Sequence, residues 1–141
     1  MIFSIADISD KNQLDKLQFS CLEKLEHQDF DYILRNNNFI VAKGEVDGKI
    51  VCFISASISI DESDILQVCV DEKYRRKGFA KELLTSFENI MKKKGVKDLF
   101  LEVNENNTPA ISLYQKMNFS QISIRKKYYG ENSAIVMHKV L

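Results

Sequence analysis

A short basic turn with one glycine, Arg75–Ala80, is the first candidate for binding chemistry. It reads Arg-Arg-Lys-Gly-Phe-Ala, between an alternating apolar run, Ile65–Val70, and an amphipathic stretch, Gly78–Lys94. The first N–H groups of a helix lack intrahelical partners and carry partial positive charge, so such a turn can bind a phosphate. A solvated basic turn before a surface helix is the simpler interpretation of the basic residues alone. The strand before the turn and the helix after it favour the phosphate site.

Glu102 and Tyr114 are candidates for moving protons. Glu102 interrupts the apolar run Leu99–Val103, where a carboxylate is costly unless it is paired, hydrated or in a cleft. A lysine partner beyond the sheet edge would explain it, but open α/β sheets also bind ligands at the carboxyl ends of their strands. Tyr114 falls on the inner face of the next predicted helix, where a core tyrosine with a bonded hydroxyl is the simpler interpretation. Asn107 is equally consistent with a turn before Thr108.

The cysteines and histidines do not form a recognisable reactive or metal-binding pattern. Cys21, Cys52 and Cys69 show no CxxC spacing, and their odd number fits a reducing cytosol. Cys69 lies on an apolar strand, which raises the pKa of a thiol, so a structural role is favoured over a nucleophilic one. His27 and His138 are far apart in the sequence. Neither a zinc site nor a catalytic triad is expected, and no metal is needed.

Composition and charge indicate an ordinary soluble domain. Apolar residues make up 45% and charged residues 28% of 141 residues, so we expect one domain over residues 1–141. The 20 basic and 20 acidic side chains cancel, which argues against bulk electrostatic binding of nucleic acid or an anionic membrane. The longest apolar run, Ile50–Ile60, is too short and polar to span a bilayer. An early Asp7 and no basic region argue against a signal peptide, so a cytoplasmic location is expected.

The elements of the first half follow from periodicity and turn signals. A strand at Ile2–Ile5 precedes a helix that Ser9 or Asp10 caps and that runs to about Glu26. Its apolar face carries Leu14, Leu17, Cys21, Leu22 and Leu25. A weaker pattern predicts a short helix around Asp31–Arg35. Three antiparallel strands should follow, joined by the hairpin signal Asp47-Gly48 and a second turn at residues 61–63: Phe39–Val46, Lys49–Ser59 and Ile65–Val70.

The second half alternates helices and strands. The helix Gly78–Lys94 should end at Gly95 in a left-handed conformation, and its apolar stripe carries Phe79, Leu83, Leu84, Phe87, Ile90 and Met91. A strand at Leu99–Asn104 leads to a short helix with Thr108 as its cap and Pro109 as its first residue. Two final strands, at 121–124 and 134–140, should flank a loop that holds Tyr128-Tyr129-Gly130. The crossover through the long helix favours one parallel strand pair.

Four stretches resemble a known family. The spacing Arg-x-x-Gly-x-Ala at 75–80 resembles the pyrophosphate loop of the GCN5-related N-acetyltransferases, the GNAT family. Residues 101–119 resemble the pattern of the same family: Glu-Val, then Asn-x-x-Ala, Leu-Tyr, a helix end and Phe. Residues 124–129 and 134–137 resemble the branch that acetylates the N-terminal alanine of ribosomal protein S18. The resemblance is close from about Leu66 to Met137, and the first sixty residues match only in element order.

The resemblance implies a role for each matching residue. It implies acetyl-CoA as the cosubstrate, Glu102 as general base and Tyr114 as general acid. Tyr128 and Tyr129 match loop tyrosines that line the peptide entrance of protein N-terminal acetyltransferases. The resemblance also implies three sets of contacts to coenzyme A. These are the strand backbone at Val68, Cys69 and Val70, the loop residues Arg75, Arg76, Lys77, Gly78, Phe79 and Ala80, and the side chain of Asn107.

Three positions depart from the pattern of that branch. Residues 26–30 read Glu-His-Gln-Asp-Phe where a Pro-Trp-Ser-like segment is usual, which bears on peptide specificity. Gly130 replaces a frequent proline after the tyrosine pair. Asn118 stands where glycine is usual, and asparagine tolerates the left-handed conformation.

The expected fold is α/β, with a GNAT-like mixed and mostly antiparallel sheet of six to seven strands flanked by about four helices. The expected function is direct transfer of an acetyl group from acetyl-CoA to the α-amine of a protein N-terminus, with ribosomal protein S18 as a candidate acceptor. Acetylation of a small amine, such as a polyamine or an aminoglycoside, would use the same donor site and stays open. Non-catalytic binding of acetyl-CoA is a third possibility, which the presence of both Glu102 and Tyr114 disfavours.

Overall fold

Seven strands form one mixed sheet in the computed structural model, which describes residues 1–22 and 26–141, with Tyr129 through its backbone alone. The strand order is β1-β2-β3-β4-β5-β7-β6. The bounds are β1 Ile2–Ile5, β2 Phe39–Val46, β3 Lys49–Ser59, β4 Glu62–Val70, β5 Asp98–Asn104, β6 Ser120–Tyr129 and β7 Asn132–Val140. Neighbouring strands are antiparallel except β4 and β5, which are parallel. The predicted fold class and the parallel pair are confirmed.

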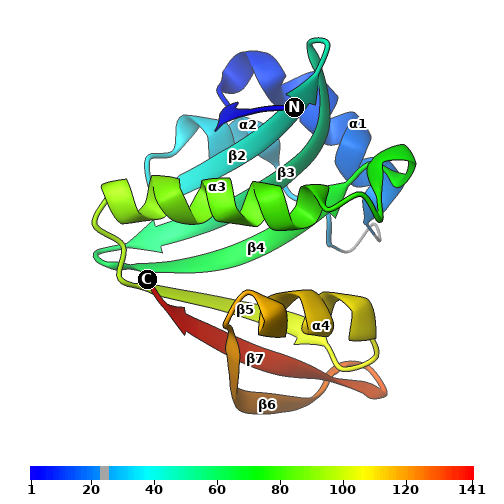
Figure 1. The fold of residues 1–141 in the computed structure, drawn as a ribbon, viewed down its shortest axis with the longest axis vertical. Coiled ribbons are helices and arrows are strands. Elements are labelled where there is room, and N and C mark those ends of the chain that lie inside the picture. Colours follow the sequence, from blue (N-terminus) through cyan, green and yellow to red (C-terminus); the bar gives the residue numbers. More distant parts are fainter. Residues whose placement is uncertain (23–25) are drawn as a thin grey trace.

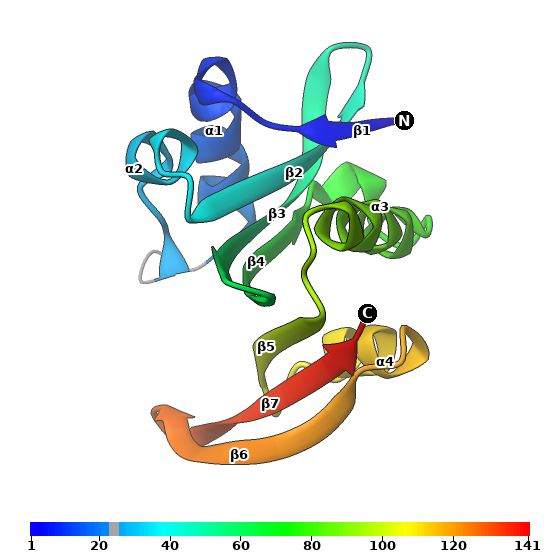
Figure 2. The ribbon, with the colours of Figure 1, turned by 90° about the vertical axis from the view of Figure 1, so that its left-hand side faces the viewer.

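Helices cover both faces of the sheet (Figure 2). Helices α1 (Lys11–Cys21) and α2 (Phe30–Arg35) lie on one face, and α3 (Phe79–Lys93) and α4 (Thr108–Lys116) lie on the other. Two short 3-10 turns, Ile8–Asp10 and Glu72–Tyr74, precede α1 and α3. Among the residues described, no helix has the length and apolar content needed to cross a membrane.

Each face of the sheet has its own hydrophobic core. Buried side chains of α1 and α2, among them Leu14 and Phe30, pack against Phe53 and Cys69 on one face. On the other face the predicted stripe of α3 and the inner face of α4 pack against β3, β5 and β7. The central strand β3 is buried on both faces over residues 50–56, which explains its nearly continuous apolar sequence. The Asp47-Gly48 hairpin is confirmed, with φ of 51° and 77° at the two residues.

The helix ends differ from the predictions in three places. Helix α1 ends at Cys21 because Leu22 is extended, and Leu25 lies outside the described residues. Asp10, one of the two predicted residues, occupies the N-cap position of α1, but its side chain makes no capping bond to that helix, and Asp7 caps the 3-10 turn before it. Asn107, not Thr108, caps α4. The two left-handed helix-end predictions are confirmed, with φ of 83° at Gly95 and 71° at Asn118.

Strand β6 is longer than predicted and continues through Tyr129. The tyrosine pair therefore ends a strand and does not lie in a loop. The pairing of β6 with β7 is irregular between Arg125 and Tyr129, where Lys127 has a φ of 55°. A β-bulge of this kind interrupts the sequence alternation, which is why the pattern ended at Ile124.

The parallel strands β4 and β5 separate along their length (Figure 1). Their pairing covers four residue pairs, from Glu62–Asp98 to Ile65–Leu101. Beyond these pairs the strands diverge, and the N-terminus of α3 and helix α4 lie toward the open end. A bulge at Leu66 accompanies the separation, because Ser55 pairs with Gln67 while Ala56 pairs with Ile65. We call the diverging segments, 66–70 of β4 and 102–104 of β5, the β4–β5 fork.

Candidate functional site

Strand β4 presents polar backbone groups to the β4–β5 fork. The carbonyl of Val70 accepts a hydrogen bond from Arg75 Nε at 2.9 Å and one from the Cys21 thiol at 3.4 Å, so it points away from β3. Backbone groups of successive residues alternate in direction along an antiparallel pair. The N–H and C=O of Val68 therefore also point away from β3, and those of Cys69 point toward it. Of the strand residues expected to bind coenzyme A, Val68 and Val70 have the suitable backbone direction.

The loop between β4 and α3 ends at an uncapped helix N-terminus. Gly78 occupies the N-cap position of α3 with a φ of 82°, a left-handed conformation that glycine adopts without strain. The N–H of Glu82 donates to the Gly78 carbonyl at 3.1 Å, so the earlier N–H groups of α3 point out of the helix. Within the described chain no side chain caps this end. The side chains of Arg76 and Lys77 are exposed beside it. A helix end of this kind can bind an anion, and the role of the loop in holding pyrophosphate stays a prediction.

An open groove extends from this loop along α3. It is lined by Gly78, Lys81, Glu82, Thr85, Ser86 and Asn89. These residues recur at helical spacing on the side of α3 that does not pack on the sheet. The groove gives a ligand held at the loop further surface to contact.

Arg75 has a different role from its basic neighbours in the loop. Its Nε donates to the Val70 carbonyl at 2.9 Å, which fixes the loop to the end of β4. Cys21 on α1 bonds to the same carbonyl, and the Cys69 thiol lies 3.7 Å from the Leu17 carbonyl. The adjacent Cys21 thiol, together with burial, raises the pKa of Cys69. Cys69 is therefore a protonated structural thiol, as the apolar strand predicted.

Glu102 projects from β5 on the face opposite α3 and α4. Leu101 and Val103, its neighbours in sequence, belong to the core beneath those helices, so alternation places Glu102 on the other face. Helices α1 and α2 contact β2, β3 and β4 there, which leaves the face of β5 more open. The Glu102 side chain is 28% exposed, and its Oε1 lies 3.1 Å from Nε of Arg125 on β6. Its partner is thus an arginine within the sheet, not a lysine beyond the edge.

Tyr114 lies on the other side of the sheet from Glu102. It is 8% exposed, belongs to the core under α3 and α4, and contacts the ring of Phe119. Burial raises the pKa of its hydroxyl to about 12, so this group stays protonated near neutral pH. It shares a face with the N-terminus of α3, the candidate phosphate site. The two residues that the resemblance implies as acid and base therefore lie on opposite faces of the sheet.

Three further predicted residues surround these groups. Asn107 caps α4 by accepting a hydrogen bond from the Ala110 N–H at 3.3 Å, and its side chain is exposed. The Tyr128 ring lies 5.6 Å from the guanidinium of Arg125, and the residue is 54% exposed. The side chain of Tyr129 lies outside the described part of the structure. The structure thus brings Glu102, Arg125 and Tyr128 together on one face.

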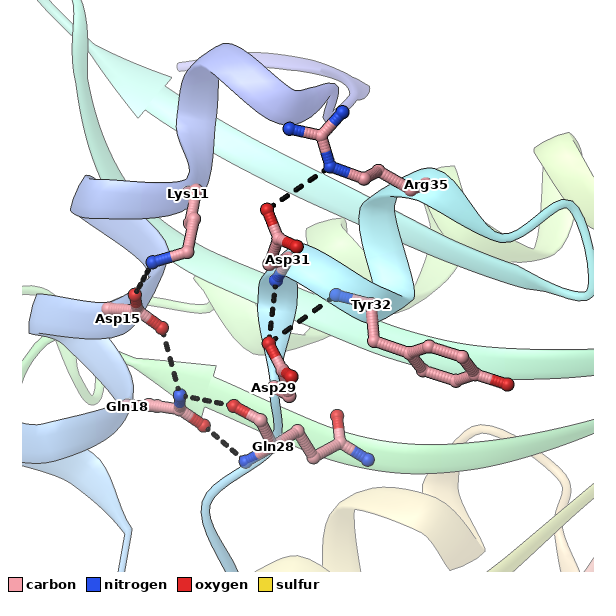
Figure 3. Close-up of polar contacts among 8 residues, drawn as sticks. All are labelled: Lys11, Asp15, Gln18, Gln28, Asp29, Asp31, Tyr32 and Arg35. Atoms are coloured by element: carbon pink, nitrogen blue, oxygen red, sulfur yellow. Dashed lines mark hydrogen bonds and ion pairs between the residues drawn. The ribbon is translucent and has the colours of Figure 1, made fainter.

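A buried glutamine network anchors the segment before α2 to the sheet. Gln18 of α1 and Gln28 form a reciprocal pair: Gln18 Nε2 donates to the Gln28 carbonyl and the Gln28 N–H donates to Gln18 Oε1, both at 2.9 Å (Figure 3). Ser55 donates to Gln28 Oε1 at 2.8 Å, and Gln67 Nε2 donates to the Glu26 carbonyl at 2.6 Å. Gln67 is the first residue of β4 after the bulge. The segment 26–28 is therefore held over β4 on the face that carries Glu102.

Sequence reasoning missed this network and Arg125. The signal for Gln67 was available, because a glutamine interrupts the apolar strand 65–70 just as Glu102 interrupts β5. No comparable signal marked Gln18, Gln28 or Arg125, which lie on sequence stretches rich in polar residues. Their importance depends on contacts between residues 10 to 49 positions apart.

Comparison with known proteins identifies the family. The model of the acetyltransferase (GNAT) family matches residues 6–119. The [ribosomal protein bS18]-alanine N-acetyltransferase of Escherichia coli strain K12 is 35% identical over 95 residues, which cover 64% of this chain and 64% of the relative. The chain thus matches just under two thirds of the length of this curated relative.

Solved structures share the fold over nearly the whole chain. The ribosomal-protein-S18-alanine N-acetyltransferase from Escherichia coli superposes with a TM-score of 0.88 at 23% identity, covering 99% of this chain and 92% of that chain. An aminoglycoside 6′-N-acetyltransferase complexed with coenzyme A superposes with a TM-score of 0.85 at 17% identity. The match covers 99% of this chain and 97% of that chain. At these identities the likeness concerns the fold.

Proposed function

Because the chain belongs to the acetyltransferase (GNAT) family, we propose that it transfers the acetyl group of acetyl-CoA to the α-amine of a protein N-terminus. The observation that carries this proposal is the arrangement at the β4–β5 fork. A buried protonated tyrosine and an uncapped helix N-terminus share one face of the sheet, and a carboxylate lies on the other. Donor and acceptor would meet at the fork from opposite faces.

The donor is held by backbone groups and by the loop. The N–H groups at the start of α3, with Arg76 and Lys77, bind the pyrophosphate of coenzyme A. The pantetheine arm lies in the fork and bonds to the outward N–H and C=O of Val68 and to the outward N–H of Val70, whose carbonyl already accepts from Arg75 and Cys21. Asn107, at the start of α4, contacts the arm from the β5 side.

The chemical step is a direct attack on the thioester. An N-terminal amine has a pKa near ~8, so much of it is protonated near neutrality. Glu102 accepts a proton, through water, as the nitrogen attacks the carbonyl carbon. An N–H group of the fork holds the developing oxyanion. The carbon–sulfur bond then breaks, and Tyr114 gives its proton to the departing thiolate.

Fewer features of the structure define the acceptor than define the donor. The curated relative acts on the N-terminal alanine of ribosomal protein bS18, and we propose the same acceptor class for this chain. Tyr128 lies on the open face beside Glu102, where its exposed ring and hydroxyl can contact an extended peptide. The anchored segment 26–28 forms the opposite wall.

A peptide panel analysed by mass spectrometry tests this function. Peptides that start with alanine, serine, glycine or methionine, with the S18 N-terminus of the same organism, are incubated with acetyl-CoA. We expect acetylation at the α-amine of the peptides that start with a small residue. Spermidine and an aminoglycoside serve as small-amine comparisons. Acetylation of either small amine with no peptide product would contradict the proposed acceptor, and no turnover at all would contradict the enzymatic role.

Substitutions then test the two proton carriers. Glu102→Gln should lower kcat by roughly 10²–10⁴-fold, the usual contribution of a positioned acid or base. Tyr114→Phe should lower kcat while leaving the affinity for coenzyme A unchanged. Glu105→Gln removes an exposed carboxylate three residues away and is the matched control. Wild-type turnover in both test variants across a pH series would remove these roles.

A further inference from the structure

Arg125 occupies the place where the acceptor amine would have to approach the base. Its Nε lies 3.1 Å from Glu102 Oε1, and its guanidinium lies 5.6 Å from the centre of the Tyr128 ring. A carboxylate on one side and an aromatic face on the other form a recognised environment for an organic cation. In this structure the cation is a side chain of the protein itself.

The sheet register explains why these three groups meet. Glu102 of β5 pairs with Val136 of β7, which in turn pairs with Ser123 of β6. Arg125 lies two residues beyond Ser123, so its side chain emerges on the same face of the sheet. Its side chain must cross β7 to reach Glu102. The irregular pairing that begins after Arg125 then brings Tyr128 beside the same guanidinium.

We infer that Glu102 and Tyr128 form a cation-binding slot, which Arg125 fills in the free protein and from which the α-ammonium group of the acceptor displaces it. The inference rests on the proposed function, since it names the group that the acceptor must replace. In this role Arg125 lowers the affinity for the acceptor, because its guanidinium competes with the acceptor ammonium for the slot. Arg125 is not itself a participant in proton transfer.

Exposure makes the displacement feasible. The Arg125 side chain is 57% exposed, so the guanidinium can leave Glu102 and enter water without leaving a buried charge behind. Ion pairs between such exposed groups contribute little, and an incoming ammonium with similar charge can compete for the same carboxylate.

Chemistry explains why the displacement matters. A guanidinium does not give up its proton at any pH that proteins normally meet, so Glu102 has no proton to accept while Arg125 fills the slot. An α-ammonium has a pKa of ~8 and, once beside the same carboxylate, can pass its proton to Glu102 through water. Replacement of one cation by the other converts the slot from a resting ion pair into a base with its substrate.

Kinetics of Arg125→Gln test the inference. The variant removes the competing cation, so the KM for an alanine-starting peptide should fall by about two- to five-fold, the factor that an exposed ion pair contributes. The KM for acetyl-CoA should not change. Lys126→Gln removes the same charge one residue away and should leave the peptide KM unchanged. A loss of kcat in Arg125→Gln without a fall in peptide KM would overturn the inference and show that Arg125 positions Glu102.

Added guanidinium ion provides a readout that a structural role would not change. At millimolar concentration it should inhibit Arg125→Gln competitively against the peptide, because it enters the vacated slot. The wild type, with its own guanidinium in place, should be much less sensitive. Equal sensitivity of the two proteins would overturn the slot.

Nitrogen NMR of Arg125 Nε separates this inference from the proposed function, because it needs no turnover. Arg125→Lys identifies the Arg125 signal by its loss. In the full chain this signal should shift on Glu102→Gln substitution, and it should shift in the same direction when an alanine-starting peptide is added with coenzyme A. These shifts in a protein that acetylates no peptide would support the slot while the proposed function fails. An unchanged signal under peptide turnover would overturn the slot while the function stands.

Discussion

Glu102 and Tyr114, the two residues proposed for proton transfer, have different surroundings. Glu102 is partly exposed on an open face of β5 beside the cationic side chain of Arg125, where an incoming amine can reach its carboxylate. Tyr114 is buried among apolar side chains, and loss of water raises the pKa of its hydroxyl to about 12. A phenol kept neutral in this way is a proton donor at neutral pH. The two proposed roles would therefore follow from two environments, one on strand β5 and one on helix α4.

The raised pKa of Tyr114 predicts a loss of stability in alkali. In the unfolded chain the hydroxyl ionises near its ordinary pKa of about 10, whereas in the folded protein it keeps its proton to about pH 12. Deprotonation therefore stabilises the unfolded state first, and the free energy of unfolding should fall as the pH rises from about 10 to 12. The contribution is at most roughly 3 kcal/mol.

Urea unfolding at about pH 8 and about pH 11 measures this effect. The fall in unfolding free energy between the two pH values should be smaller in Tyr114→Phe than in the wild type. Tyr32→Phe changes an exposed tyrosine and should keep the wild-type dependence. An identical pH dependence in the wild type and Tyr114→Phe would mean that Tyr114 is not buried as described.

Two backbone irregularities at the scale of single elements shape the proposed donor site. The bulge at Leu66 lets β4 separate from its parallel partner β5. In the described chain, the backbone groups of Val68 and Val70 that point away from β3 therefore do not pair with a strand across the fork. Gly78 then turns the chain from the basic loop into α3 with a φ of 82°. A regular strand and a helix capped by a side chain would satisfy these groups internally. The departures from regularity leave hydrogen-bonding groups for a ligand.

Gly78 and Gly95 form a matched pair for testing the loop. Their φ angles are 82° and 83°, and a Cβ added at either would meet nothing within 4 Å. Gly78→Val and Gly95→Val should therefore each lower the free energy of unfolding by a similar ~1–3 kcal/mol, the cost of a left-handed non-glycine residue. Only Gly78→Val should weaken coenzyme A binding in calorimetry, because its side chain obstructs the phosphate. Equal coenzyme A affinities in the two folded variants would exclude the loop as the pyrophosphate site.

At the scale of the whole molecule, two parts of the sheet are joined by a short parallel contact. Strands β1 to β4 carry the donor loop, and strands β5 to β7 carry Glu102 and Arg125. Only four residue pairs join β4 to β5. Glu88 of α3 and Lys139 of β7 reinforce the contact through a largely buried ion pair, with Nζ–O distances of 2.8 and 3.0 Å. A ligand in the fork would therefore bridge both parts.

This arrangement predicts where coenzyme A should change amide hydrogen exchange. The N–H groups of Val68 and Val70 face the fork, so bound coenzyme A should slow their exchange by bonding to the strand. The Cys69 amide points toward β3 and should change much less. Exchange measured by NMR with and without coenzyme A gives all three values at once. Equal protection of all three amides would indicate that coenzyme A stabilises the whole fold, by about 2.7 kcal/mol at a hundredfold excess over Kd. That result would contradict a pantetheine arm bound in the fork.

Local sequence determined most of the elements and marked Glu102 and Tyr114 as the two central candidates for proton transfer. Period-2 alternation, Asp47-Gly48 and the stripe of α3 depend on neighbours close in the chain, so they predicted strands, hairpin and helix correctly. Glu102 stood out because a charge interrupts an apolar strand. Tyr114 was placed on an inner helix face by spacing alone. The acetyltransferase family was also evident from short motifs at 75–80 and 101–119.

Tertiary structure decided what these residues face. The opposite faces of Glu102 and Tyr114, the two breaks in strand pairing and the ion pair with Arg125 all depend on how distant strands align. A strand sequence specifies which residues alternate, but a bulge such as that at Leu66 or after Arg125 changes which face later residues occupy. Gln67 and Gln28 likewise acquire their roles only when α1 and β4 pack together. Contacts between distant segments leave no periodic trace in the sequence, which is why only the folded chain reveals them.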